Sequence, residues 1–217
     1  MLGVVPIEKG EIAKAKKYWA DQGETDLGFY DTEQHWSKRL GEFMKQPEVM
    51  AKSVFEFGCH VGRNLRVIKE VSGCKVAGID VNKHAIDYGK ENNKLSLKVG
   101  DHNSLKQMKT NSFDVCITVS ALDHVPAIDI ALENLVRIAK SWMIMIEPFE
   151  YGAEGKLVEY MDKSGKMNPA TPYTYIWDYE KRLAALRKKI LEFTIDEMPL
   201  SGVNLGPYYK LFIVKMR

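Results

Sequence analysis

Five short apolar segments alternate with helical patterns through the middle of the chain. They predict β-strands near residues 53–57, 75–80, 95–99, 113–119 and 142–147. Hydrophobic residues spaced three and four positions apart predict helices near residues 62–72, 83–92 and 127–140. Strands and helices that alternate over short connections favour a parallel sheet covered by helices on both faces. The pattern therefore predicts a doubly wound α/β fold, which binds ligands beyond the carboxyl ends of its strands.

The segment before these strands is predicted to be helical. The spacing of Ala15 and Trp19 predicts a first helix, and Asp31–Gln34 has the spacing of a capping box that starts a second helix, ended by Pro47. A polar, glycine-bearing loop over residues 21–30 joins the two helices. We expect this loop to be a flexible cover above a ligand.

The segment after the strands differs in composition from the middle of the chain. It begins with a tyrosine-rich insertion, in which the glycines and lysines of residues 152–172 predict a loop. The remaining patterns predict a helix near residues 179–191, a strand near 192–197 and a last strand over 208–216. We expect the insertion and the first fifty residues together to cover the carboxyl ends of the strands.

Length and composition are those of one soluble globular domain. The chain has 217 residues, of which 45% are hydrophobic and 28% charged, which suits one substantial core and is short for two. A net charge of +2 provides no field that would attract a polyanion, so we expect no nucleic acid partner. The longest apolar runs have the length of strands, so no membrane segment or signal peptide is expected, and a cytoplasmic location follows. The sequence does not determine the oligomeric state.

Three cysteines, Cys59, Cys74 and Cys116, are distributed through the middle of the chain. Their odd number and the lack of Cys-x-x-Cys spacing indicate neither a disulfide framework nor a zinc site. We therefore expect reduced thiols and no metal.

Candidate chemistry begins where the first apolar strand breaks into a glycine turn. Gly58 and Gly62 allow the backbone to turn sharply and to approach a ligand closely, and the amides of the following helix point to the same place. Asp80 ends the next strand 18 positions after Gly62, about where an acid that binds ribose belongs. A third acid, Asp101, follows the third strand. The carboxylate of Glu56 would repel a pyrophosphate, which argues against a nicotinamide dinucleotide.

This order of acids at three strand ends resembles the class I methyltransferases that use S-adenosylmethionine. The acids are Glu56 with its glycine turn, Asp80 and Asp101. The resemblance covers roughly residues 53–150 and implies a Rossmann-like, mostly parallel sheet of seven strands whose last strand is antiparallel. The form Gly-Cys-x-x-Gly-x-Asn-Leu is also similar to methyltransferases associated with pseudaminic-type sugar biosynthesis. His60 stands where the family usually has a glycine, and we expect the backbone there to need no positive φ.

The resemblance also implies which residues meet the cofactor. Asp80 would accept hydrogen bonds from the ribose hydroxyls, although it could instead cap the next helix. Asp101 would accept the adenine amino group, with the amide of His102 on a ring nitrogen, although Asp101 could instead form a local Asx-turn. Arg63 would meet the methionine carboxylate, unless it is a solvated surface residue. The full expected set is Glu56, Gly58, Cys59, His60, Gly62, Arg63, Asn64, Asp80, Val81, Asp101, His102, Ser120 and Ala121.

Asp123 and His124 follow the fourth strand, where the resemblance places the acceptor of the methyl group. A histidine accepts protons near neutral pH, so His124 is a candidate base, with a structural role as the alternative. We expect His124 to matter more than Asp123, which could cap the turn that follows. Flat aromatic and polar side chains suit a small acceptor. The candidate acceptor contacts are Trp19, Tyr30, Glu147, Tyr173, Tyr175 and Trp177. The alternative for Trp19 and Tyr30 is that they dock the preface on the body of the protein. For Tyr173, Tyr175 and Trp177 it is an aromatic latch between the tail helix and the sheet, and for Glu147 it is a strand end.

Together these features predict one methyltransferase domain over residues 1–217. Residues 1–50 would form a helical lid, residues 51–150 the cofactor-binding core, and residues 151–217 the acceptor-side insertion and last strands. The predicted function is S-adenosylmethionine-dependent O- or N-methylation of a small molecule, such as a sugar or an amine. An NAD-dependent oxidoreductase and a non-catalytic cofactor-binding module remain as alternatives.

Overall fold

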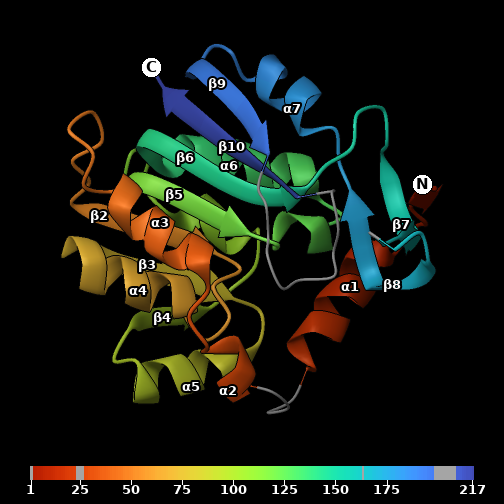
Figure 1. Ribbon diagram of the computed structural model, residues 1–217, viewed down its shortest axis with the longest axis horizontal. Coiled ribbons are helices and arrows are strands. Elements are labelled where there is room, and N and C mark those ends of the chain that lie inside the picture. Colours follow the sequence, from red (N-terminus) through yellow and green to blue (C-terminus); the bar gives the residue numbers. More distant parts are fainter. Residues whose placement is uncertain (1, 23–26, 163, 198–208) are drawn as a thin grey trace.

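A seven-stranded sheet forms the centre of the protein (Figure 1), which is described here by a computed structural model over residues 2–22, 27–162, 164–197 and 209–217. The strand order is β4-β3-β2-β5-β6-β10-β9. The five strands from β4 to β6 run parallel, and β10 is antiparallel to both of its neighbours. The strands are β2 (Ser53–Phe57), β3 (Lys75–Asp80), β4 (Ser96–Val99), β5 (Phe113–Val119), β6 (Ala139–Pro148), β9 (Ile190–Glu197) and β10 (Tyr209–Met216). The predicted doubly wound fold is confirmed.

Helices cover both faces of this sheet because alternate strand residues point to opposite sides. Val54 packs in a core with the helices on one face, while its neighbour Phe55 packs in the core on the other face. The first face carries α3 (His35–Phe43), α4 (Arg63–Ser72) and α5 (Lys83–Asn92), and the second carries α6 (Ile128–Ile138) and α7 (Tyr179–Ala185). Two short 3-10 helices, η1 (Ser104–Gln107) and η2 (Leu122–His124), follow β4 and β5.

The strands and helices predicted for the middle of the chain are found within a few residues of their expected bounds, but two predicted helix ends are wrong. The second helix of the preface begins at His35, and its N-cap Gln34 makes no side-chain capping bond. The side chain of Asp31 instead pairs with Arg66 at 3.4 Å and accepts a hydrogen bond from Asn93 at 3.0 Å, so it serves tertiary packing. The helix predicted to reach residue 191 ends at Ala185.

A second, three-stranded sheet lies beside the first. It has the order β1-β7-β8, formed by β1 (Leu2–Val5), β7 (Gly155–Met161) and β8 (Met167–Ile176). The predicted loop over residues 152–172 is therefore wrong, because most of it forms this antiparallel hairpin. No pattern predicted β1, whose pairing with β7 joins the start of the chain to the insertion after β6.

Helix α1 (Glu11–Ala20) crosses beside the hairpin, as Figure 1 shows, and is followed by the single turn α2 (Leu27–Tyr30). Glu11 is buried and accepts hydrogen bonds from Lys156 Nζ at 2.7 Å and from the hydroxyl of Tyr175. These contacts fasten the start of α1 to the hairpin. The proposed cover over residues 21–30 includes residues 23–26, which lie outside the described part of the chain. No helix in the described ranges has both the length and the apolar character needed to cross a membrane.

Candidate active site

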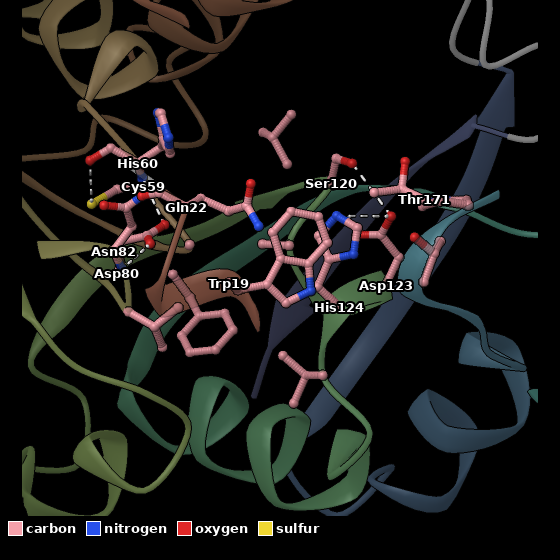
Figure 2. Close-up of a pocket in the computed structure, with 18 of the residues that line it drawn as sticks. Trp19, Gln22, Cys59, His60, Asp80, Asn82, Ser120, Asp123, His124 and Thr171 are labelled. Carbon is pink, nitrogen blue, oxygen red and sulfur yellow. Dashed lines mark hydrogen bonds and ion pairs between the residues drawn. The ribbon is translucent and has the colours of Figure 1, made fainter. Parts of the chain in front are cut away.

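A cavity of about 990 Å³ opens at the carboxyl ends of the parallel strands. Its wall combines the turn after β2, the ends of β3 and β5, the inner side of α1 and part of the hairpin. Figure 2 shows two groups of polar side chains within it. We call the group around Cys59, His60, Asp80 and Asn82 the loop end, and the group around Ser120, Asp123, His124 and Thr171 the Asp123 end.

The turn after β2 brings its backbone very close to the turn after β5. Gly58 has φ +70°, and a Cβ atom there would lie 2.3 Å from the Cβ of Ala121. His60 has φ +49°, so the expectation that this position needs no positive φ is wrong. The strained conformation is held by its amide, which donates to Asp80 Oδ2 at 2.9 Å, and by the ring of Tyr30, 4.4 Å away. Gly62 does not line the cavity but caps α4, where a Cβ would meet Leu95 at 2.5 Å.

Glu56 is buried beneath this turn and is only half satisfied. Its Oε1 accepts a hydrogen bond from Asn64 Nδ2 at 2.7 Å, and Asn64 Oδ1 accepts one from Ser37 at 2.6 Å. Its Oε2 has no partner. Burial raises the pKa of Glu56 to about 8, which means that the carboxyl is protonated at neutral pH unless a positive charge comes close.

Arg63 is not a solvated surface residue. Its guanidinium lies over the ring of Trp36, 5.3 Å from the ring centroid, and its side chain lines the cavity. The buried Nε atom of Arg63 has no partner. Burial lowers the pKa of Arg63, and the nearby Glu56 opposes this effect. Arg63 therefore combines a place in the cavity wall with a buried donor that has no acceptor.

Asp80 organises the loop end with both carboxylate oxygens. Oδ2 accepts from the amide of His60, and Oδ1 accepts from the amide of Asn82 at 2.8 Å. The predicted capping alternative belongs instead to Asn82, whose side chain accepts from the amide of Ala85 at 3.1 Å. Asn82 also donates to the carbonyl of Gln22 at 2.8 Å. Asp80 is left half-buried at the cavity wall, next to Val81.

Asp101 and His102 lie at the cavity beyond β4. Asp101 Oδ1 accepts from the amides of Asn103 and Ser104 at 2.9 and 3.2 Å, so the Asx-turn is present. Its Oδ2 pairs with Lys16 Nζ of α1 at 2.6 Å. Burial acts to raise the pKa of Asp101, but Lys16 and the two amides outweigh it and hold that pKa below its usual range. Asp101 is therefore ionised, and helix α1 supplies its counter-ion.

The Asp123 end is built on the turn after β5. Ser120 has φ +48°, and its hydroxyl lies 2.6 Å from the hydroxyl of Tyr209 and 3.4 Å from Asp123 Oδ2. Asp123 is buried, and its Oδ1 has no partner. Burial raises the pKa of Asp123 to about 7. The buried carboxyl can therefore gain or lose a proton near neutral pH.

His124 lies beside Asp123, with 3.6 Å between its Nε2 and Asp123 Oδ2. The indole ring of Trp19 packs on the imidazole with 3.9 Å between centroids and a tilt of 35°, and the carbonyl of Tyr173 lies 3.4 Å from Nδ1. A carbonyl only accepts, so this contact favours the tautomer with hydrogen on Nδ1. Burial lowers the pKa of His124 to about 4. The imidazole is therefore neutral at physiological pH.

Glu147 does not line the cavity, which corrects the expectation that it faces an acceptor. It is fully buried behind the turn, where its carboxyl oxygens accept from the amides of Ala121, Leu122 and Asp123 at 3.2–3.3 Å. Burial first, and then the charge of Asp123, raise the pKa of Glu147 to about 8. Its position makes it a support for the backbone that presents Asp123.

The aromatic candidates separate into two groups. Trp19 and Tyr30 line the cavity, whereas Tyr175 and Trp177 are buried in the core, where Trp177 Nε1 donates to the carbonyl of Leu122 at 3.1 Å. Tyr173 also lies outside the cavity wall and packs on Tyr18 at 5.4 Å. The alternative of an aromatic latch is thus the one that the structure supports for the hairpin tyrosines and tryptophan.

Several cavity residues were not anticipated from the sequence, and the most informative are Lys16, Trp36, Asn82, Thr171 and Tyr209. Asn82 carried a usable signal, because it stands two positions after a strand-end acid and before a helix. The others come from α1, α3, β8 and β10, which meet the site only through tertiary packing.

Residues 55–144 match the family described as "Methyltransferase domain". This match identifies the middle of the chain as a methyltransferase-type domain. Its fold is shared with a methyltransferase from Aquifex aeolicus (21% identity, 94% of this chain and 98% of that chain, TM-score 0.58). It is shared also with phosphoethanolamine N-methyltransferase 1 of Haemonchus contortus, solved with phosphoethanolamine and S-adenosylhomocysteine (18% identity, 94% of this chain and 49% of that chain, TM-score 0.63).

The same fold occurs in a protein that is described as a cyclase. The [4+2]-cyclase SpnF is 15% identical and covers 83% of this chain and 80% of its own, with a TM-score of 0.59. No curated protein matches the sequence significantly. At such low identities the solved structures establish the fold, and the function of this chain has to be argued from its own residues.

Proposed function

We propose that this domain transfers the methyl group of S-adenosylmethionine to an oxygen or nitrogen atom of a small molecule. The observation that carries the proposal is one continuous cavity. Its loop end has the features of a cofactor-binding loop, and its other end holds the buried, ionisable carboxyl group of Asp123. Its volume of about 990 Å³ is at the upper end of the usual range for small-molecule sites. A cofactor and a modest acceptor fit this space together.

Unsatisfied polar atoms at the loop end suit the methionine part of the cofactor. Glu56 Oε2, His60 Nδ1 and Arg63 Nε are buried and lack partners. An ammonium group would satisfy Glu56 and favour its ionised form, and a carboxylate would satisfy Arg63. The missing side chain at Gly58 leaves the backbone free to come close to the ligand.

The remaining cofactor contacts follow the strand ends. Asp80 has lone pairs left for ribose hydroxyls beyond the two loop amides that it already accepts. Asp101 would receive the adenine amino group only by sharing its Oδ2 with Lys16 or releasing that lysine. We assign cofactor contact to the expected residues that line the cavity, namely Glu56, Gly58, Cys59, His60, Arg63, Asn64, Asp80, Val81, Asp101, His102, Ser120 and Ala121.

The bound cofactor supplies an already activated methyl group, so the protein has to orient the acceptor, exclude water and remove a proton. A base is most effective when its pKa lies near the working pH. Asp123, with its pKa near 7, meets this condition better than His124, with its pKa near 4. We therefore assign proton acceptance to Asp123 and orientation to His124, which reverses the order of importance expected from the sequence.

Helix α1 serves as the cover in this proposal. Lys16 reaches Asp101, Trp19 packs on His124, and the carbonyl of Gln22 just beyond the helix accepts from Asn82. One helix thus touches the sites assigned to adenine, ribose and acceptor. The proposed division of labour is a lid in residues 1–50, a cofactor core in 51–150 and acceptor-side elements in 151–217, with β1 and β7 tying the first and last parts together.

The proposal is tested by binding and by product identification. Calorimetry should show that S-adenosylmethionine binds and that NAD does not. Incubation with methyl-labelled cofactor and a metabolite extract, followed by mass spectrometry, should identify a labelled small molecule. Micromolar binding of NAD without binding of S-adenosylmethionine would refute the proposal, as would cofactor binding without any labelled small product.

Two variants separate a catalytic role of the Asp123 end from a structural one. Asp123→Asn should lower turnover by about 10²–10⁴-fold, the usual loss for a general base, with little change in cofactor affinity. Asp129→Asn is the matched control, because Asp129 is an α6 carboxylate that is 72% exposed and pairs with Arg182 away from the cavity wall. Equal turnover of the two variants would remove Asp123 from the reaction.

A further inference from the structure

Building on the proposed function, we propose that the Asp123 end recognises a cationic amine on an apolar body and rejects phosphorylated and carboxylated acceptors. The inference concerns the charge class of the acceptor, which the methyl-transfer reaction by itself leaves open.

The first observation is an unpaired buried oxygen. Asp123 is 2% exposed, and its Oδ1 has no hydrogen-bond partner. Its Oδ2 has a long contact of 3.4 Å with the Ser120 hydroxyl and lies 3.6 Å from the ring of His124, and the buried carboxyl of Glu147 interacts with Asp123 from behind the turn. A buried carboxyl group without a partner is costly, and a ligand that donates to it recovers that cost. An ammonium group does so best, since it supplies both a hydrogen bond and the opposite charge.

The second observation is the placement of the positive charges. The described residues that line the cavity include one lysine, Lys16, and one arginine, Arg63. Lys16 is held by Asp101, and Arg63 lies over Trp36, so both belong to the cofactor side. His124 is neutral because burial lowers its pKa to about 4. A phosphate or carboxylate at the Asp123 end would therefore face a carboxyl group with no cation to offset the repulsion.

The third observation is the nature of the surrounding wall. Trp19 stands beside His124, and the hairpin contributes Leu157, Tyr160 and Ile176 to the same cavity. Aromatic faces attract cations, and apolar side chains bury a hydrocarbon body. Trp19 Nε1 is also buried without a partner, so an oxygen atom on the ligand would give it an acceptor. An amine with an apolar, hydroxyl-bearing body matches all of these groups.

The binding test uses three probes that share one phenol ring and differ in the charge of a short side chain. They are tyramine (cationic), tyrosol (neutral) and 3-(4-hydroxyphenyl)propanoate (anionic), each titrated by calorimetry into the full chain saturated with S-adenosylhomocysteine. Tyramine should bind about ten- to a hundredfold more tightly than the others, the range for hydrogen bonds to a charged group. Asp123→Asn should remove this preference, and Asp129→Asn should keep it. Failure of tyramine to bind, or equal or tighter binding of either other probe, overturns the inference.

A second test reads the charge of the natural acceptor directly. A metabolite extract is separated by ion exchange into cationic, neutral and anionic fractions, and each is incubated with protein and methyl-labelled cofactor. Label in the cationic fraction supports the inference, and label confined to the neutral or anionic fractions overturns it while leaving the proposed function intact. Absence of label from every fraction, with cofactor bound, contradicts the proposed function instead.

Discussion

The close approach of two turns at Gly58 allows a stability prediction with an internal control. An alanine at this position must keep φ +70° and place its Cβ 2.3 Å from the Cβ of Ala121. A left-handed conformation costs a non-glycine residue about 1–2 kcal/mol. The contact lies far inside van der Waals distance and involves a short side chain that cannot swing away, so overpacking adds about 1–3 kcal/mol. Gly58→Ala should therefore lower the free energy of unfolding by about 2–5 kcal/mol.

Gly73→Ala isolates the conformational part of this cost. Gly73 ends α4 at φ +73°, and a Cβ there would meet nothing within 4 Å. Gly73→Ala should therefore lower the free energy of unfolding by only about 1–2 kcal/mol, the cost of the left-handed backbone conformation. The difference between the two variants then measures the clash between the two turns.

The assay is urea denaturation followed by circular dichroism, with midpoints compared at equal slope. Calorimetry with S-adenosylhomocysteine adds a functional readout, because Gly58 lines the cavity and Gly73 does not. Gly58→Ala should lower the affinity for S-adenosylhomocysteine about tenfold for each 1.4 kcal/mol of ligand contact that the added methyl group removes. Gly73→Ala should leave this affinity unchanged. Equal stabilities and equal affinities of the two variants would refute the packing argument and the placement of the ligand against this turn.

Three further outcomes are expected. Asp80→Asn should weaken cofactor binding by about 1.5–3 kcal/mol in calorimetry, and unchanged affinity in a folded variant would exclude Asp80 from the site. Glu147 has a raised pKa in the folded state, so its ionisation destabilises the wild type as pH rises from about 4.5 to about 8. The stability advantage of the wild type over Glu147→Gln in urea should therefore shrink across this range, and a constant difference would contradict the assigned burial. Glu11→Gln should lower the free energy of unfolding by about 1.5–3 kcal/mol, because it breaks the pair with Lys156, and no loss would show that α1 is anchored by other contacts.

Local patterns along the chain determined the central sheet and the positions of its acids. The strands ending at Phe57, Asp80 and Val99 were predictable because apolar periodicity and glycine turns act over a few residues. Once a parallel sheet is predicted, its carboxyl ends meet along one edge, so Asp80 and Asp101 had to lie near the glycine turn. The resemblance to methyltransferases rested on these short-range features.

The roles within the site depended on contacts between distant segments. Lys16 meets Asp101 across 85 positions of sequence, and β1, over residues 2–5, pairs with β7, over residues 155–161. Neither pairing can be read from a local sequence pattern, because Lys16 could have paired with many acids and β1 with many strands.

Burial was equally invisible in the sequence. Asp123, His124 and Glu147 have ordinary ionisable side chains, and only their enclosure by α1, the hairpin and β6 shifts their proton affinities in opposite directions. The sequence by itself therefore predicted the central sheet and the edge of that sheet at which the candidate site lies. The tertiary structure decided which of the neighbouring acids and bases can handle a proton, because desolvation is a property of the packed environment and not of the residue.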